Sequence, residues 1–368
     1  MHRDTTILHA GYRGTHEIGV FLAGPQFSAA YTAPGDPTQH ELTYGRFHNP
    51  TWQAFEQALG IIEGGQVVSF ASGMAAVAAV FGVCLAPGDA VVLPSDSYYT
   101  TRLLATNWLQ RLGVEVRTAP TLGGAQRDLI GGARLLWLET PTNPGLDVCD
   151  IHELAAVARR TGTLVAVDNT TATAYLQQPL ALGADYVVAS DTKGLTGHSD
   201  LILGHVAVTD PTRAAALHTW RTQHGAVPGP METWLAHRSL ATLPVRQQRQ
   251  CGSAQHLAEF LASHAAVKAV YYPGLPNHPG HAIARRQMQA FGTVVSFELA
   301  TAAQATDFLS GLQLVREATS FGGVHSSAER RARWGGDQVA EGFIRFSVGC
   351  EDVGDIIDDV GRSLAAAV

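Results

Sequence analysis

The chain lacks the features by which membrane-spanning and secreted proteins are recognised. No apolar run approaches the length of a membrane span, and the first residues contain no apolar signal segment. Only four cysteines occur among the 368 residues, without a CxxC pair, at Cys84, Cys149, Cys251 and Cys350. We interpret them as reduced thiols of a cytoplasmic protein rather than as a disulfide framework.

Basic blocks and the usual metal and dinucleotide motifs are also missing. The formal net charge is −7, and without a basic block we expect neither nucleic acid nor a membrane as a partner. The 16 histidines form no HExxH pattern, and His278 and His281 lie in a Pro/Gly loop without nearby carboxylates, so no metal is expected. A nicotinamide-dependent oxidoreductase would need a GxGxxG motif after the first strand, and the chain contains none.

Apolar residues, in contrast, are plentiful. They make up 46% of the chain, enough for a large core, and the length fits two domains. Residues 1–50 are broken by Gly-Pro and Pro-Gly pairs, which predicts an irregular arm lying on its own domain or on a neighbour. We place a large domain at 51–235 and a smaller C-terminal α/β domain at 236–368.

The large domain begins with a predicted phosphate-binding turn. Trp52–Leu59 has the apolar spacing of a helix, which Thr51 can cap. A strand at 66–70 is followed by Gly73 and Met74 and then by an alanine-rich helix. Backbone N–H groups at such a turn can approach an anion, although Ser-Gly at a helix start is common and the signal is weak by itself.

A second segment predicts a strand–helix–strand unit. The apolar strand 134–138 precedes Asp150, which can cap a helix with Glu153 three positions later, and Gly162 ends that helix before the next strand. The other expected elements are strands at 90–93, 114–117, 269–272, 293–299 and 343–348, and helices at 103–112, 231–265 with a break at Pro244, 281–290, 302–309 and 353–364.

The most informative stretch runs from residue 163 to residue 205. Two short apolar runs end on polar groups: the first on Asp168, the second on Ser190, Asp191, Thr192 and Lys193. They predict two buried strands of an α/β sheet, and ligands sit at the carboxyl ends of such strands. A lysine and a carboxylate placed there suit pyridoxal 5′-phosphate (PLP), because the amine can bind the aldehyde and the acid can pair with the pyridine nitrogen. Alternatively, Asp168 caps a strand end and Lys193 is a solvated loop cation.

Together these motifs resemble the Cys/Met-metabolism family of PLP enzymes, which includes cystathionine γ-synthase, the cystathionine β- and γ-lyases and methionine γ-lyase. The most specific piece is VDNTTATAYLQQPLALGADYVVASDTKGLTGHSD at 167–200, where the family pattern reads VDNTFATPYLQNPLALGAD, then S-x-T-K and G-H-S-D. Further matches are Tyr44-Gly45-Arg46, Ser72-Gly73-Met74, ETPTNP at 139–144, YPGLPNHPGH at 272–281 and RFSVG at 345–349. The match covers nearly the whole chain.

The resemblance implies fold type I of the PLP-dependent transferases: a large domain with a mostly parallel sheet between helices, and a smaller C-terminal α/β domain. It implies that Lys193 binds PLP, that Asp168 pairs with the pyridine nitrogen, and that Tyr98 stacks on the ring and relays protons. It assigns the phosphate to Ser190, Thr192, Gly73 and Met74, the ring O3′ side to Asn143, and the substrate α-carboxylate to Arg345 and Ser320. Tyr98 could instead pack in the core, Arg345 could pair with Glu351 at the surface, and Ser320 could merely turn a loop.

The resemblance also implies an assembly. Tyr44 and Arg46 would reach the phosphate of a neighbouring subunit, since a planar guanidinium suits phosphate oxygens. Dimers with shared active sites would pair into a homotetramer.

The expected activity is a cytoplasmic PLP-dependent carbon–sulfur lyase that cleaves cystathionine by α,γ-elimination to cysteine, 2-oxobutyrate and ammonia. Alternatives are cystathionine β-lyase, methionine γ-lyase, a γ-synthase acting on O-acylhomoserine, and a PLP-binding assembly partner without turnover. The chain departs from its relatives at Tyr99, at Asp191 and at His325, where several relatives carry an acidic residue. Because Tyr99 and His325 are expected near the distal end of the substrate, they leave its identity open.

Overall fold

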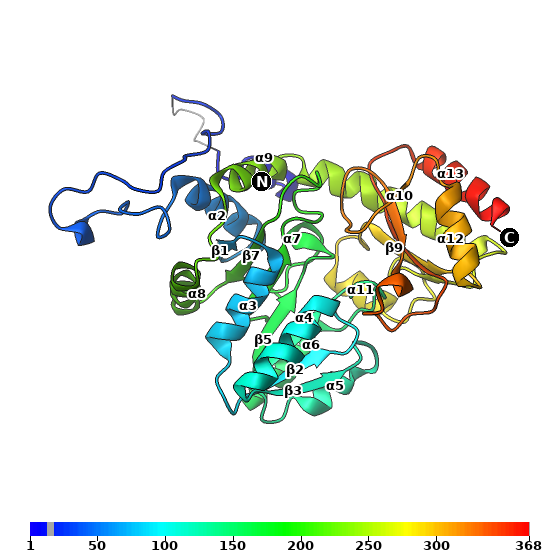
Figure 1. Ribbon diagram of the computed structural model, residues 1–368, viewed down its shortest axis with the longest axis horizontal. Helices are drawn as coiled ribbons and strands as arrows, with labels where there is room; N and C mark the ends of the chain where they lie inside the picture. The colour runs from blue at the N-terminus through cyan, green and yellow to red at the C-terminus, as the bar shows by residue number, and fades with distance from the viewer. Residues whose placement is uncertain (13–17, 368) are drawn as a thin grey trace.

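Two α/β lobes make up the body of the molecule, and the N-terminal arm projects from it (Figure 1). The computed structural model describes residues 1–12 and 18–367. The first lobe holds a seven-stranded sheet in the order β1-β7-β6-β5-β4-β2-β3. Its strands are β1 (Gln66–Phe70), β2 (Ala90–Pro94), β3 (Glu115–Ala119), β4 (Leu135–Glu139), β5 (Leu164–Asp168), β6 (Tyr186–Ser190) and β7 (Gly204–Val208). Strand β7 runs opposite to the other six strands of this sheet, which are parallel to one another. The predicted mostly parallel sheet is therefore confirmed.

Both faces of this sheet are buried, which explains why its strands read as continuous apolar runs. Val165 and Val167 belong to one apolar cluster and Ala166, between them, to the other. The first cluster includes side chains of α2 (Pro50–Glu63) and α6 (Ile151–Thr161), and the second those of α3 (Gly73–Cys84) and α8 (Pro211–His224). The remaining helices of this lobe are α4 (Tyr99–Leu104), which continues as π- and 3₁₀-turns to Leu112, α5 (Ala125–Leu129), α7 (Thr173–Leu176) and α9 (Pro230–Leu240).

Two of the predicted helix boundaries can be checked at their caps. Asp150 accepts a hydrogen bond from the N–H of Glu153 at 3.0 Å, and Gly162 ends α6 with φ of 70°, as predicted. The prediction that Thr51 caps α2 was wrong. Pro50 occupies the first helical position, so the cap falls on Asn49, whose side chain accepts from the N–H of Thr51 at 2.9 Å.

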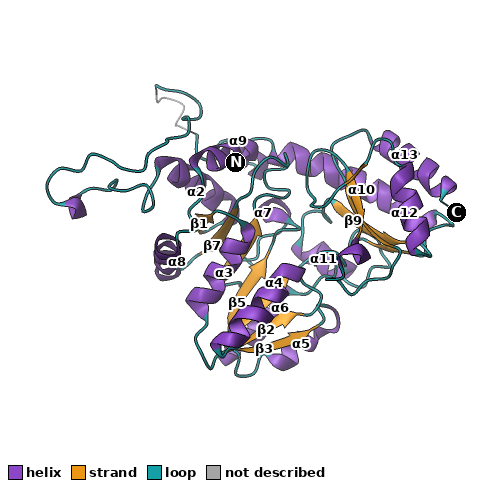
Figure 2. Cartoon of the chain, viewed as in Figure 1, coloured by secondary structure: helices purple, strands orange, loops and turns teal. Residues whose placement is uncertain are grey.

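The second lobe is the predicted smaller α/β unit (Figure 2). Its sheet has the order β10-β11-β12-β9-β8, with β8 (Ala269–Tyr271), β9 (Val294–Glu298), β10 (Arg316–Glu317), β11 (Ser327–Arg330) and β12 (Phe343–Ser347). Helices α10 (Leu243–Ser263) and α12 (Ala302–Gly311) pack on this sheet, and α13 (Val353–Ala366) packs against both. The predicted break in the helical stretch 231–265 lies between α9 and α10, just before Pro244. Pro244 itself occupies the first turn of α10. Helix α11 (His281–Gln287) stops before residue 290 because Met288 pairs with Gln177.

The arm is less irregular than predicted. Helix α1 (Arg3–Leu8) is tied to the first lobe, because Arg3 donates to the carbonyl of Tyr175 at 2.8 Å and the hydroxyl of Tyr175 donates to Asp4 at 3.0 Å. Between residue 18 and residue 49 the chain forms an arm that projects from the body and has a short 3₁₀-turn at Pro37–Gln39 (Figure 1). Near its base, Trp234 of α9 donates to the carbonyl of Ala23 at 2.9 Å. The domain limits at 50 and 235 stay predictions. In the part of the chain that the structure describes, no helix is both long and apolar enough to cross a bilayer.

Candidate active site

A cavity of about 290 Å³ lies where β4, β5 and β6 of the first sheet end. It is lined by ten of the predicted site residues: Gly73, Met74, Tyr98, Asn143, Asp168, Ser190, Thr192, Lys193, Ser320 and Arg345. The first eight come from the first lobe and the last two from the second. The fold therefore brings together residues that are separated by up to 272 positions in the sequence.

The first wall of the cavity is the turn before α3. Ser72 caps this helix by accepting from the N–H of Ala75 at 3.1 Å. A Cβ atom added to Gly73 would lie 2.7 Å from Cβ of Ser190, so only glycine allows this close approach. The start of α3 thus lies against Ser190 at the end of β6, and a helix N-terminus beside a hydroxyl suits an anion.

Asp168 forms the floor of the cavity at the end of β5. It is nearly fully buried, and its Oδ1 accepts from the N–H of Thr170 at 3.0 Å. Burial raises the pKa of Asp168, and among the described residues no cationic side chain forms an ion pair with this carboxylate. A protonated pyridine nitrogen would supply such a partner, so the site fits PLP.

Lys193 follows β6 and points to the second lobe. Its Nζ donates to Oγ of Ser320 at 2.8 Å and lies 5.4 Å from the ring centre of Phe321. Burial first, and then the positive charge of Arg345, lower the pKa of Lys193 to about 8. Ser320 itself has φ of 76°, a conformation that is costly for a serine and common at functional sites.

The depressed pKa gives a test on the cofactor-free protein. The rate of PLP attachment is expected to rise with pH and level off above about 8, because only the unprotonated amine attacks an aldehyde. In Arg345→Gln a nearby positive charge is lost, so the inflection should move to higher pH. Stopped-flow absorbance of the cofactor measures both curves. An unchanged inflection in the variant would contradict this electrostatic account.

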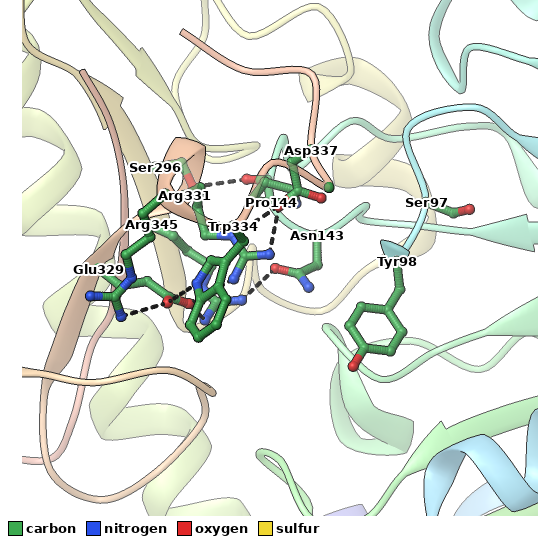
Figure 3. Close-up of polar contacts among 12 residues, drawn as sticks. Ser97, Tyr98, Asn143, Pro144, Ser296, Glu329, Arg331, Trp334, Asp337 and Arg345 are labelled. Carbon is green, nitrogen blue, oxygen red and sulfur yellow. Dashed lines mark hydrogen bonds and ion pairs between the residues drawn. The ribbon is translucent and has the colours of Figure 1, made fainter. Parts of the chain in front are cut away.

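Arg345 is buried in β12 and anchors the other side of the cavity (Figure 3). Its Nη1 donates to Oδ1 of Asn143 at 2.7 Å, and its Nη2 donates to the carbonyl of Ser320 at 2.8 Å and pairs with Glu329. The alternative that Arg345 is a surface partner of Glu351 was wrong. Glu351 instead accepts from the N–H of Ser326 at 2.6 Å.

Several residues around the cavity were missed by the sequence analysis. Glu329 is fully buried and accepts from Arg331 at 2.8 Å and from Trp334 at 2.9 Å, besides pairing with Arg345. Burial alone would raise the pKa of Glu329, but Arg345 and these neighbours bring it below its ordinary value. Arg331 lines the cavity directly and is also paired with Asp337. The sequence analysis missed them because β11, which carries Glu329, is too short and polar to be recognised as a strand. Only the tertiary fold brings these groups together.

A buried ion triad supports the segment that carries Lys193. His205 on β7 contacts Oδ1 of Asp191 through Nδ1 at 2.6 Å and Oε1 of Glu63 through Nε2 at 3.1 Å. Burial would lower the pKa of His205, but Asp191 and Glu63 raise it to about 10. Asp191, at which the chain differs from its relatives, therefore anchors the segment two residues before Lys193 to β7.

Tyr44 and Arg46 do not reach this cavity within their own chain. Tyr44 is exposed, and Nη1 of Arg46 donates to the carbonyl of Thr222 at 2.6 Å. His325 lines an open hollow that adjoins the cavity, and Tyr99 is partly exposed with its ring 5.9 Å from the guanidinium of Arg102. The contact of the arm with a neighbouring subunit stays a prediction.

Comparison with known proteins agrees with this geometry. Residues 4–365 match the family model described as Cys/Met metabolism PLP-dependent enzyme. The chain belongs to this family. A Streptomyces coelicolor protein named provisionally as a cystathionine gamma-lyase is 53% identical, over 93% of this chain and 88% of that protein.

Other relatives in the family carry out different reactions. The cystathionine beta-lyase of Lactococcus lactis subsp. cremoris is 37% identical, over 98% of both chains. The crystal structure of cystathionine gamma synthase from Xanthomonas oryzae in complex with cystathionine has a TM-score of 0.95 and 32% identity, over 99% of this chain and 98% of that chain. The family, the fold type and PLP dependence are thus confirmed, and this chain is an enzyme of Cys/Met metabolism. The roles of single site residues stay predictions.

Proposed function

We propose that this enzyme is a carbon–sulfur lyase that cleaves cystathionine by α,γ-elimination to cysteine, 2-oxobutyrate and ammonia. The observation that carries the proposal is a lysine with a depressed pKa, Lys193, in one cavity with a buried carboxylate, Asp168, and a buried guanidinium, Arg345. The preference for the γ-elimination rests on the relative that is 53% identical.

The proposed chemistry assigns one task to each group. PLP, when bound, supplies an electron sink for the charge that forms at Cα of the substrate. Lys193 would hold the cofactor and, as a free amine, would take a proton from Cα, deliver it to the cofactor, and then take a second proton from Cβ. Arg345 holds the α-carboxylate, which keeps the Cα–H bond near Lys193. Tyr98 donates a proton to the departing sulfur when the Cγ–S bond breaks.

The remaining residues would hold the cofactor. Asp168 would keep the pyridine nitrogen protonated, while Gly73, Met74, Ser190 and Thr192 would bind the phosphate. Asn143 would sit at the O3′ side of the ring, where Arg345 already fixes its amide.

We further propose a homotetramer in which dimers share active sites. The arm projects from the body of the molecule (Figure 1), and its residues Tyr44 and Arg46 do not line the cavity of their own chain, which supports this proposal. In the assembly they would contact the phosphate of the neighbouring subunit.

Product identification tests the reaction. Incubation with cystathionine is expected to give cysteine and 2-oxobutyrate, because the proposal has Lys193 take protons from both Cα and Cβ. Mass spectrometry of the products distinguishes this from β-elimination, which gives homocysteine and pyruvate. Pyruvate as the main keto acid would overturn the proposal in favour of a β-lyase. Faster turnover of methionine would indicate a methionine γ-lyase, and replacement on O-acylhomoserine by cysteine a γ-synthase.

A further inference from the structure

Glu139 is a buried carboxylate that lines the cavity and has no task in the chemistry above. It is the last residue of β4, and 3% of its surface is exposed. Each of its two oxygens accepts one backbone hydrogen bond. Oε2 accepts from the N–H of Tyr98 at 2.7 Å, and Oε1 accepts from the N–H of Asn143 at 2.8 Å.

These two bonds begin a chain of contacts that crosses the cavity. Oδ1 of Asn143 accepts from Arg345 at 2.7 Å, and Arg345 donates to the carbonyl of Ser320 at 2.8 Å. Oγ of Ser320 then accepts from Nζ of Lys193 at 2.8 Å. Figure 3 shows the part of this chain between Asn143 and Arg345, with Tyr98 directed toward the same space.

The position is electrostatically unfavourable for a carboxylate. Glu139 is directly opposite Asp168 in the register of β4 and β5, and both are buried. Burial and the charge of Asp168 raise the pKa of Glu139 well above its ordinary value. A group that costs stability here needs another reason to be present.

The geometry supplies that reason. Two N–H donors converge on one side chain, so both of its terminal atoms must accept. A carboxylate meets this demand, whereas the amide of glutamine would turn an N–H group against one of the donors. An aspartate, one methylene shorter, would hold its carboxylate farther from both donors.

We propose that Glu139 is a positioning residue that fixes Tyr98 and Asn143 at one edge of the cavity, so that the tyrosine and Arg345 keep their places during the reaction. The inference rests on the proposed roles of Tyr98 and Arg345. It adds that these roles depend on a single carboxylate that touches neither the departing sulfur nor the α-carboxylate.

Glu139→Gln tests this inference in the holoenzyme, with Asp96→Asn as the matched control. Asp96 is a carboxylate in the same loop as Tyr98, but it accepts from Thr121 at 3.0 Å and does not line the cavity. The first measurement is the visible circular dichroism of bound PLP without substrate, divided by its absorbance. We expect this ratio to fall clearly in Glu139→Gln, because the ring of Tyr98 is displaced, and to stay unchanged in Asp96→Asn.

The second measurement is a double-mutant cycle in kcat. Glu139→Gln is expected to lower kcat about 10- to 100-fold, the cost of a misplaced catalytic group. If Glu139 acts through Tyr98, then Tyr98→Phe should cost much less in the Glu139→Gln background than in the unmodified enzyme. If the effects of Glu139→Gln and Tyr98→Phe on kcat simply multiply, the inference is overturned. Unchanged dichroism of bound PLP in Glu139→Gln would also overturn it.

A second variant separates the carboxyl group from its reach. Glu139→Asp keeps a carboxyl group beside Asp168 and should lose kcat and dichroism as Glu139→Gln does. Full function of Glu139→Asp would show that the length of the side chain does not matter and would also overturn the inference. If Tyr98→Phe has no effect on the unmodified enzyme, the proposed role of Tyr98 fails, while the substrate-free dichroism still tests Glu139.

Discussion

Replacing Lys193 by alanine is expected to lower kcat by at least about 10⁴-fold, the upper end of what a positioned proton carrier contributes. Two functions are lost together, because the same amine holds the cofactor and moves the protons at Cα and Cβ. The variant should still bind some PLP without a covalent bond, since Asp168 and the turn before α3 remain. Steady-state turnover of cystathionine measures the first effect, and equilibrium dialysis with PLP the second.

The chain offers a matched control for this experiment. It contains two lysines, Lys193 and Lys268. Lys268 lies just before β8 in the second lobe and does not line the cavity, so Lys268→Ala should leave kcat unchanged. If kcat of Lys193→Ala were within about tenfold of that of the unmodified enzyme, Lys193 could not be the essential proton carrier, and the account would be contradicted.

Asp168→Asn is expected to weaken PLP binding or lower kcat by about 10²- to 4 × 10³-fold, since breaking a buried charge pair costs about 3–5 kcal/mol. The asparagine keeps the size of the side chain but cannot hold the pyridine nitrogen protonated. As a result the ring becomes a poorer electron sink. The dissociation constant of PLP from dialysis and kcat measured at saturating PLP separate the two effects.

The matched control for Asp168 is Asp185→Asn. Asp185 stands just before β6, at the other end of the sheet from the cavity, where it accepts from the N–H of Val165 at 2.8 Å. Its loss should affect stability without changing PLP affinity. Equal losses of PLP affinity in both variants would show that any carboxylate of these strands has the same effect, which contradicts a specific role for Asp168.

The sequence predicted the first lobe well because its signals are local. Buried parallel strands are continuous apolar runs, and helix ends such as Asp150 and Gly162 have their own side-chain chemistry. The same signals located the cavity, because polar residues that follow these strands must meet at one edge of the sheet. The wrong cap at Thr51 arose because Pro50 occupies the first helical position, so the helix starts two residues earlier than predicted.

In the second lobe, β8, β9 and β12 were predicted, but β10, β11 and the residues that support Arg345 could not be predicted in this way. Glu329 and Arg331 come from a short polar strand and the turn after it, and only their contacts with Arg345 give them significance. Glu139 stood inside a recognised motif, but a sequence does not reveal that its two oxygens accept from Tyr98 and Asn143. These hydrogen bonds depend on the distances between different segments of the chain, and the hydrophobic pattern of a sequence does not predict such distances.

The central claim is that PLP is bound covalently to one particular amine. Borohydride reduction of the PLP-loaded enzyme, followed by peptide mapping, tests it most directly, because the chain has only two lysines. We predict one reduced pyridoxyl group per chain, located on Lys193 and absent after competition with substrate amine. A stable label on Lys268 alone, or no label on an enzyme that turns over cystathionine, would contradict the account.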